Sequence, residues 1–200
     1  KKEIRSQRRS PCTAVLKEIT FKFYLPVSYE AGFFLTGSVK MPIHTIPPVF
    51  DENSKILILG SFPSVKSREA DFFYGHLQNR FWRVVSAVLS HPEPHSVTEK
   101  KAMLLNNGIA LWDVVASCDI WGSSDSTIKN VVPNDISVIT DVADIKKIYL
   151  NGGTASRLFY KYISPDVKIE AVTLPSTSPA NARFSLEMLE CEWSIIKEYI

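Results

Sequence analysis

Amide and hydroxyl side chains carry most of the chemistry that this sequence offers, and they gather in three short segments. Each segment directly follows an apolar run that is typical of a buried strand. The segments are Gly60-Ser-Phe-Pro-Ser64, Asn151-Gly-Gly153 and Ser176-Thr-Ser178. Ligands of an open α/β sheet bind beyond the carboxyl ends of its strands. Each segment alone is more typical of a turn, but parallel strands would bring all three to one rim and predict a polar binding site there.

A loop rich in aromatic residues follows the first segment and adds a second kind of chemistry. It reads Asp71-Phe-Phe-Tyr-Gly-His-Leu-Gln-Asn-Arg-Phe-Trp82. Its rings can stack a flat ligand, and three successive aromatics cannot all point inward from one loop, so at least one should face a ligand. The amide of Asn79 offers both a donor and an acceptor. Because Asn79 stands where a helix opens, it is equally well suited to cap that helix.

Three familiar kinds of site do not fit the sequence. Residues 60–67 resemble a phosphate-binding loop, but Val65 replaces its second glycine and Pro63 has no N–H to donate. The same segment lacks the G-x-S-x-G pattern of a serine nucleophile, and no histidine follows His95. The prolines beside His91 and His95 exclude the helical spacing that would aim both imidazoles at one ion. We therefore expect no metal site.

Composition points to one folded domain in a reducing compartment. A chain of 200 residues with 45% hydrophobic content can bury a sizeable core. Three scattered cysteines, Cys12, Cys118 and Cys191, indicate neither a disulfide framework nor a metal site. No stretch reaches the roughly 18 apolar residues of a membrane span. We expect an intracellular protein with no membrane partner.

Charge separates the first 40 residues from the rest. They hold eight Lys and Arg against three Asp and Glu, whereas residues 41–200 hold 15 against 18. We expect residues 1–40 to be a leader or extension, either disordered or introduced for expression, with Met41 as the natural start. A basic DNA-binding arm is the alternative. Residues 41–200 are expected to form a single domain that binds nucleic acid through a local patch only.

Apolar patterns position these segments on an α/β framework. We expect strands at 55–59, 109–114, 147–150 and 168–174, a polar loop at 122–130, and helices at 79–89, 97–106, 134 or 135 to 142, 154–162 and 184–199. Strands that alternate with helices predict a mostly parallel sheet covered on both faces.

Two parts of the sequence resemble motifs of the uracil-DNA glycosylase superfamily, over about residues 51–200. The segment 60–64 with the run Tyr74-Gly-His-Leu-Gln-Asn-Arg-Phe-Trp82 looks most like the hypoxanthine-DNA (deoxyinosine) glycosylases, and Leu174-Pro-Ser-Thr-Ser-Pro-Ala-Asn-Ala182 looks like the superfamily's second motif. The resemblance implies a three-layer α/β/α fold with a short, mostly parallel central sheet. It also implies hydrolysis of the N-glycosidic bond of a deaminated base in double-stranded DNA, without metal or other cofactor. We expect a monomer that is cytoplasmic, at a bacterial or archaeal nucleoid, or otherwise intracellular.

One departure from the superfamily pattern selects among its branches. Many members have Asn or Asp at the third position of the first motif, where this chain has Phe62. The hypoxanthine branch also has an apolar residue there and carries its catalytic Asn in the later run, which implies that Asn79 is catalytic. A mismatch-specific uracil/thymine glycosylase, which shares the Asn-x-Phe-Trp run, remains an alternative. A catalytically weak lesion-binding protein and a nucleotide-binding regulator are further alternatives.

The resemblance also implies a role for each segment of the site. Asn79 would position the attacking water or bond the base, Tyr74 would stack the extruded base, and Asn151 would read its edge. Backbone groups of Ser61 and Phe62 would complete the pocket. DNA contacts would come from Ser64, Lys66, Ser67, Ser176, Thr177, Ser178, Pro179 and Asn181, the last two within a loop that fills the gap left by the base. Asp71 or Asp113 could orient the water, and no lysine is clearly placed to form a Schiff base, so we expect a monofunctional hydrolase.

Overall fold

A parallel sheet forms the centre of the structure, a computed structural model that describes residues 42–121 and 124–200. The prediction for residues 1–40 therefore lies outside the described residues. The four strands lie in the order β2-β1-β5-β6 and all neighbours are parallel. They are β1 (Ile56–Gly60), β2 (Ile109–Asp113), β5 (Lys147–Asn151) and β6 (Ala171–Leu174). The predicted mostly parallel sheet is thus confirmed.

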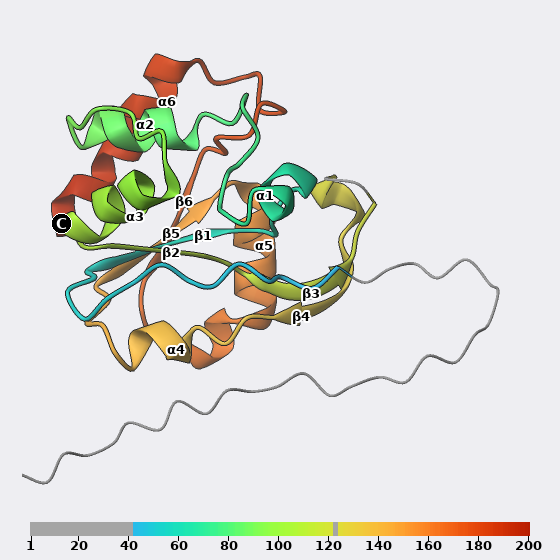
Figure 1. The fold of residues 1–200 in the computed structure, drawn as a ribbon. Coiled ribbons are helices and arrows are strands. Elements are labelled where there is room, and N and C mark those ends of the chain that lie inside the picture. The colour runs from blue at the N-terminus through green and yellow to red at the C-terminus, as the bar shows by residue number, and fades with distance from the viewer. Residues whose placement is uncertain (1–41, 122–123) are drawn as a thin grey trace, which may run out of the picture. The chain divides into compact units, whose positions relative to one another are not determined.

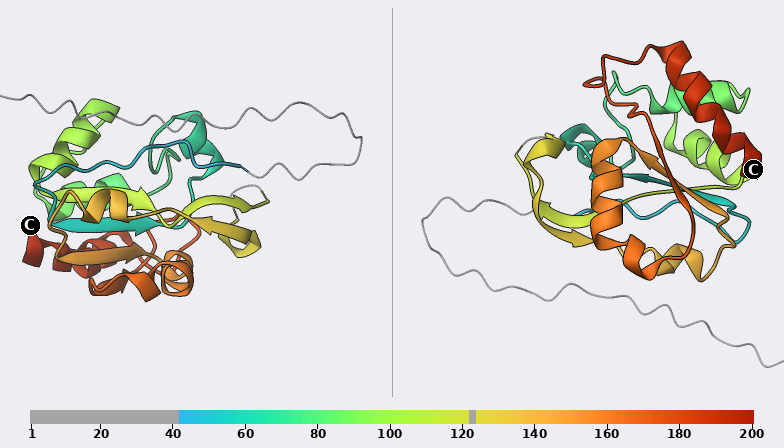
Figure 2. Two further views of the ribbon diagram at one scale, coloured as in Figure 1. Left: turned by 90° about the horizontal axis from the view of Figure 1, so that it is seen from below. Right: turned by 180° about the vertical axis from the view of Figure 1, so that it is seen from behind.

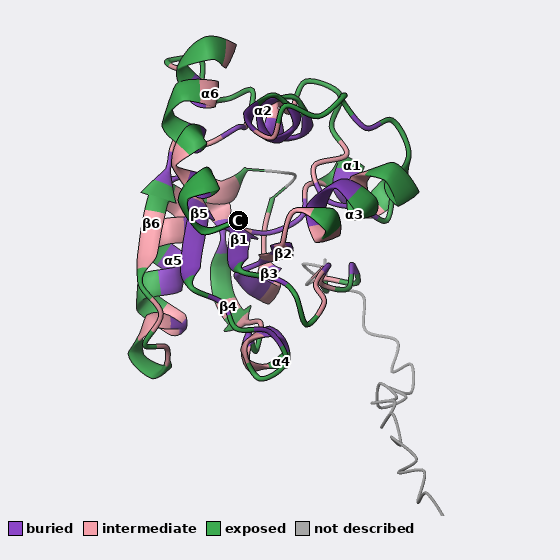
Figure 3. Ribbon diagram, turned by 90° about the vertical axis from the view of Figure 1, so that its left-hand side faces the viewer, coloured by how far each residue is buried: buried purple, intermediate pink, exposed green. Residues whose placement is uncertain are grey.

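The central strands are apolar on both faces because helices cover both faces. Strand β1 is buried along its whole length, as the colouring by burial in Figure 3 shows. Alternate side chains of a strand point to opposite faces, so Ile56 and Ile58 join one hydrophobic cluster and Leu57 and Leu59 the other. An unbroken apolar run is the pattern expected of a doubly covered parallel strand.

Two helical layers sandwich the sheet and give the three-layer α/β/α fold that was predicted (Figures 1 and 2). One layer contains α2 (Phe81–Val88), α3 (Val97–Asn106) and α6 (Leu186–Trp193), which continues as a 3-10 helix over Ser194–Tyr199. The opposite layer contains α4 (Ser137–Thr140) and α5 (Gly153–Tyr162). No described helix is both long and apolar enough to cross a bilayer.

A small hairpin that the sequence did not predict follows β2. Strands β3 (Val115–Asp119) and β4 (Lys129–Pro133) pair antiparallel, with shifts in register. Most of β4 is exposed and the pairing is irregular, so no alternation of apolar residues marks it. The predicted strand at 109–114 therefore runs one residue past the end of β2, and the predicted polar loop at 122–130 overlaps the start of β4. Three further corrections concern helices. The short helix α1 (Val65–Glu69) was not predicted, α4 has half its predicted length, and the last predicted helix ends as a 3-10 helix.

The extended segment before β1 closes the edge of the sheet. Val49 bridges Leu111 of β2, and Ile43 bridges Ser117 of β3, both antiparallel. The backbone N–H of His44 donates to the carbonyl of Ala116 at 2.7 Å. These contacts bring the side chain of His44 to the carboxyl end of β2.

Candidate active site

A cavity of about 600 Å³ opens at the carboxyl ends of the parallel strands. All three polar segments of the sequence contribute to its wall, as does the aromatic loop. The predicted site residues on this wall are Ser61, Phe62, Ser64, Ser67, Tyr74, Asn79, Asn151, Ser176, Thr177, Ser178 and Asn181. Its volume lies within the range of about 300–1,000 Å³ that is usual for small-ligand sites.

Three side chains form a hydrogen-bonded network that we call the amide side: Asn79, Thr177 and Asn151. The hydroxyl of Thr177 donates to Oδ1 of Asn79 and accepts from Nδ2 of Asn151, each at 3.0 Å. The backbone N–H of Thr177 donates to Oδ1 of Asn151, also at 3.0 Å. Thr177 is fully buried, so its hydroxyl joins two motifs instead of making the phosphate contact that the sequence predicts.

Asn79 combines the two roles that its position suggested. Its Oδ1 accepts from the backbone N–H of Phe81 at 3.0 Å, and this bond satisfies one of the unpaired donors at the start of α2. The structure gives its Nδ2 no partner among the described residues, so this donor is left to a ligand. The helix start and the Thr177 hydroxyl together fix the orientation of the amide.

Asn151 ends β5 in strand conformation, and the tight turn falls on the next residue. Gly152 has φ of 95°, and a Cβ there would lie 2.7 Å from Cβ of Ser176. Only glycine allows this close approach without strain. The turn therefore brings the Ser176 loop against the end of β5, which allows Asn151 to reach Thr177.

Phe73 and Tyr74 of the aromatic loop both line the cavity, and Tyr74 is the more exposed of the two. Phe72 and Phe73 are buried in the core, whereas Tyr74 is half-buried and stacks on Phe81 with ring centroids 4.0 Å apart. Its φ of 53° lies in the left-handed region, which is uncommon for a bulky residue. Burial, with the negative charge of Asp113, raises the pKa of Tyr74 well above its ordinary value.

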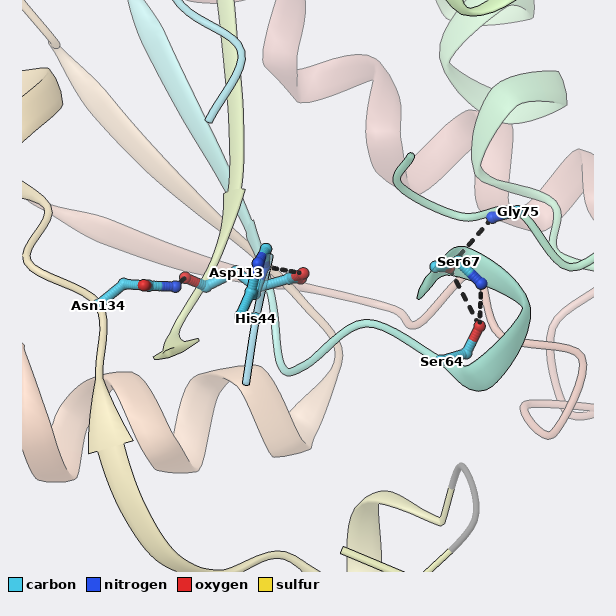
Figure 4. A network of polar contacts seen from close by, with 6 residues as sticks. All are labelled: His44, Ser64, Ser67, Gly75, Asp113 and Asn134. Carbon is cyan, nitrogen blue, oxygen red and sulfur yellow. Dashed lines mark hydrogen bonds and ion pairs between the residues drawn. The ribbon is translucent and has the colours of Figure 1, made fainter. Parts of the chain in front are cut away.

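Two carboxylates line another part of the cavity wall, which we call the carboxylate side: Asp113, which pairs with His44 behind the wall, and Asp125, which pairs with Ser61. Nε2 of His44 lies 2.9 Å from Oδ2 of Asp113, and the two side chains are 1% and 5% exposed (Figure 4). The hydroxyl of Ser61 donates to Oδ2 of Asp125 at 2.8 Å. Burial, with the nearby charge of Asp113, raises the pKa of Asp125 above its ordinary value, against the opposing bond from Ser61.

Arg80 fixes the loop that follows β6. Its guanidinium donates to the carbonyls of Ser178 at 2.8 Å and Asn181 at 2.9 Å, and also to those of Thr177 and Phe184. A planar fork with five donors suits several carbonyls at once. Arg80 therefore positions the second motif against the first.

The remaining predicted residues have structural partners or lie away from the cavity. Ser64 caps α1 by accepting from the N–H of Ser67, whose hydroxyl accepts from the N–H of Gly75 at 3.1 Å (Figure 4). Lys66 pairs with Glu69 at 2.7 Å on the exposed side of α1 and does not line the cavity. Pro179 lines a second, open hollow, whose other residues are Leu77, Gln78, Arg80, Arg83 and Glu93.

The sequence did not indicate His44 or Asp125 as site residues. His44 lies 69 positions from Asp113 in a segment without periodicity, and Asp125 follows a hairpin strand that was not predicted. Of the two carboxylates left open, Asp113 lines the cavity, whereas Asp71 is exposed and lies outside its lining. Among the described residues, no group of three or more His, Cys, Asp or Glu side chains is arranged to hold a metal ion.

Comparisons with known proteins agree with this geometry. The family described as the Uracil DNA glycosylase superfamily matches residues 47–198. A hypoxanthine DNA glycosylase of Methanosarcina acetivorans is 38% identical over 152 residues, which cover 75% of this chain and 94% of that protein. One from Methanosarcina barkeri is 34% identical over 150 residues, covering 74% and 93%.

A solved structure shares the fold. The solution NMR structure of a protein from Methanosarcina acetivorans, described as a proposed uracil DNA glycosylase, superposes with a TM-score of 0.66 at 35% identity. The match covers 76% of this chain and 94% of that one. The resemblance that the two motifs carry is thereby confirmed across the whole domain, and the chain belongs to the uracil-DNA glycosylase superfamily.

Proposed function

We propose that this protein is a monofunctional DNA glycosylase that hydrolyses the N-glycosidic bond of a deaminated base, with hypoxanthine in deoxyinosine as its substrate. One observation carries the proposal: Asn79, Thr177 and Asn151, which belong to separate motifs, form a single hydrogen-bonded network on the cavity wall. The alignment with two relatives named hypoxanthine DNA glycosylase, over nearly their whole lengths, supports the same substrate.

The cavity suits a base that has been flipped out of the duplex. Chemistry at the glycosidic bond of a paired nucleotide requires that the nucleotide leave the stack, at a cost of a few kcal/mol that is lower for a mispaired base. A volume of about 600 Å³ accommodates a purine. Tyr74 would stack the extruded base, and an aromatic platform contributes about 1–3 kcal/mol per base.

Amide groups would recognise the base and orient the water. Asn79 Nδ2 has no partner among the described residues, so it can bond the water or an acceptor of the base. An amide oxygen can accept two hydrogen bonds and an amide nitrogen can donate two. Thr177 uses one of each at Asn151, so the remaining acceptor and donor of Asn151 would contact the edge of the base. The backbone of Ser61 and Phe62 would complete the pocket.

DNA contacts would be local. Ser176, Ser178 and the backbone of the loop that Arg80 holds would bond phosphates, together with Ser64, Lys66 and Ser67. Pro179 and Asn181 would lie in the loop that fills the space left by the base. The substrate is double-stranded DNA with one damaged base, bound by residues 41–200 as one domain of a monomer in the cytoplasm.

Hydrolysis without strand cleavage is supported by the composition of the wall. A glycosylase that also cuts the strand uses an amine to form a Schiff base with the sugar. The described residues that line the cavity include no lysine. The product would therefore be free base and an intact strand with an abasic site.

Base release from matched duplexes tests the proposal. Identical oligonucleotides would carry one deoxyinosine, one deoxyuridine or no lesion, and alkali would reveal abasic sites after reaction. We expect cleavage at deoxyinosine well above cleavage at deoxyuridine, and none without alkali. Reaction mainly at deoxyuridine would favour the mismatch uracil/thymine branch, and binding without base release would favour a lesion-binding protein.

A further inference from the structure

We infer that Asp113, oriented by His44, is the carboxylate that accepts the proton of the attacking water. This inference rests on the glycosylase function proposed above. It names a group for the one part of the reaction that the amide side cannot perform, because a carboxamide is not a base at neutral pH. A positioned general base contributes about 10²–10⁴-fold to a rate.

The backbone of β1 makes room for one oxygen of Asp113 on the cavity wall. Asp113 ends β2 directly opposite Gly60, the last residue of β1. A Cβ on residue 60 would lie 2.1 Å from Oδ1 of Asp113 and 3.0 Å from the hydroxyl oxygen of Tyr74. The carboxylate oxygen and the phenol thus converge on the same point beside the cavity, and only a residue without a side chain permits this.

His44 holds the other oxygen of the carboxylate. An ionised carboxylate only accepts hydrogen bonds, so the imidazole Nε2 donates to Oδ2 across 2.9 Å. The imidazole is itself enclosed by three aromatic rings, those of Phe62, Phe73 and Trp112, with centroids 6.0 to 6.4 Å away. With His44 fixed, the carboxylate has one preferred orientation.

Oδ1 is left for a ligand. Among the described residues, the side chain of Asp113 has no hydrogen-bond partner other than His44. Because Asp113 lines the cavity, a water bound there can donate a hydrogen bond to this free oxygen. The structure therefore supplies an oriented, negatively charged acceptor in the same cavity as Asn79 and Tyr74.

The reaction then balances as a simple hydrolysis. The water oxygen forms a bond to C1′ as the bond from C1′ to the base nitrogen breaks, and the electron pair leaves on the base. The proton of the water passes to Oδ1 of Asp113, the base takes up a proton from solvent, and Asp113 then releases its proton to solvent, which restores the carboxylate. The carboxylate also stabilises the positive charge that develops on the sugar in the transition state.

Other carboxylates near the cavity are less well suited. Asp71 is exposed and lies outside the lining. Asp125 lines the cavity, but its orienting partner is the hydroxyl of Ser61, a group that rotates more freely than a caged imidazole. Of the carboxylates among the described residues near the cavity, Asp113 is the one that combines a fixed partner with a neighbouring glycine that leaves space at its free oxygen.

Single-turnover base release from a deoxyinosine duplex tests the inference, with duplex affinity measured separately. Asp113→Asn keeps size and removes the charge, so we expect the rate to fall at least 100-fold with little change in affinity. The matched control is Asp71→Asn, which should react at the wild-type rate. Because His44 acts through Asp113, His44→Leu should slow the reaction far more than His44→Gln, whose amide can still donate to the carboxylate.

The outcomes separate this inference from the function on which it rests. No base release by the wild type would overturn the proposed function. If the wild type is active and folded Asp113→Asn reacts within about threefold of its rate, the inference alone is overturned. A large loss of rate in Asp125→Asn without a loss in Asp113→Asn would overturn it as well. Should Asp113→Asn not fold, Gly60→Ala decides instead: its Cβ displaces the carboxylate, and a folded variant must lose at least tenfold in rate.

Discussion

The two sides of the cavity distribute their hydrogen bonds differently. On the amide side, Asn79, Thr177 and Asn151 bond one another through three contacts of 3.0 Å, so each side chain depends on the next. On the carboxylate side, Asp113 and Asp125 each accept one side-chain bond, from separate partners on separate elements. The amide side is therefore a hydrogen-bonded unit that fixes geometry, whereas the two carboxylates share no hydrogen bond with each other and interact through charge, since Asp113 raises the pKa of Asp125.

Among the substitutions that test this difference between the two sides, we expect Asn79→Ala to have the largest effect on the rate of base release. Removing one preorganised donor from a reacting centre costs about 10²–10³ in rate, and we expect a loss of that size in single-turnover base release. The substitution also removes the acceptor for Phe81 N–H, and losing such a cap costs about 1 kcal/mol of stability.

The control for Asn79→Ala is Asn107→Ala. Asn107 ends α3, and its amide donates to the carbonyl of Met103 at 2.7 Å, so this variant also loses an amide bond at a helix end. It lies outside the cavity lining and should keep the wild-type rate. Equal rates in the two variants would mean that Asn79 acts only as a cap.

Thr177→Val tests whether the amide side is coupled, with the next largest expected effect. Valine keeps the shape of threonine but leaves Asn79 Oδ1 without the Thr177 donor and Asn151 Nδ2 without its acceptor. Unsatisfied buried groups cost about 1–3 kcal/mol, and we expect base release to fall about 10–100-fold. Thr173→Val is the control, because the exposed hydroxyl of Thr173 donates to Ser156 and to no other side chain within the described part of the chain.

Double variants distinguish a coupled unit from a set of independent groups. Residues that share a network give non-additive effects, while separated residues add within about 0.3–0.5 kcal/mol. Thr177→Val combined with Asn151→Ala should therefore cost less than the sum of the two single effects on rate. Additive effects in this pair would remove the distinction between the two sides.

The same contrast explains how far the sequence predicted the site. The amide side could be predicted because Asn151 ends the apolar strand β5, Thr177 lies just beyond β6 and Asn79 precedes a helix, so local pattern brings them to one rim. The interior use of the Thr177 hydroxyl was missed, since nothing local distinguishes it from the hydroxyls of Ser176 and Ser178. Its burial depends on Asn79 and Asn151, which come from distant segments.

The carboxylate side was largely invisible in the sequence. His44 occupies an extended segment whose pairing with β2 and β3 depends on isolated bridges, not on a hydrophobic repeat. Asp125 is brought to Ser61 by a hairpin whose second strand is mostly exposed and therefore lacks an apolar pattern. Long-range contacts of single polar residues leave little trace in composition or periodicity, whereas buried strands and amphipathic helices do.

The smallest expected effect is on the free energy of unfolding, which we expect the buried carboxyl of Asp125 to lower. Burial raises the pKa of this carboxyl in the folded state, so the folded chain holds the proton more tightly than the unfolded chain does. Its contribution is complete below the ordinary Asp pKa of about 4 and is lost as pH rises through the folded value. Asp125→Asn removes the ionisation, so the variant should gain stability relative to wild type as pH rises toward neutrality.

Thermal unfolding of both proteins between about pH 4 and pH 8 measures this difference, with Asp144→Asn as a control of opposite sign. A hydrogen bond from Lys146 lowers the pKa of Asp144, so its charge favours the folded state, although solvent screening makes the contribution of an exposed pair small. A pH-independent gap between Asp125→Asn and wild type would show that Asp125 is not an unfavourable charge. A gap that opens with pH would mean that the fold tolerates a costly carboxylate at the cavity, which is the behaviour expected of a group retained for its charge.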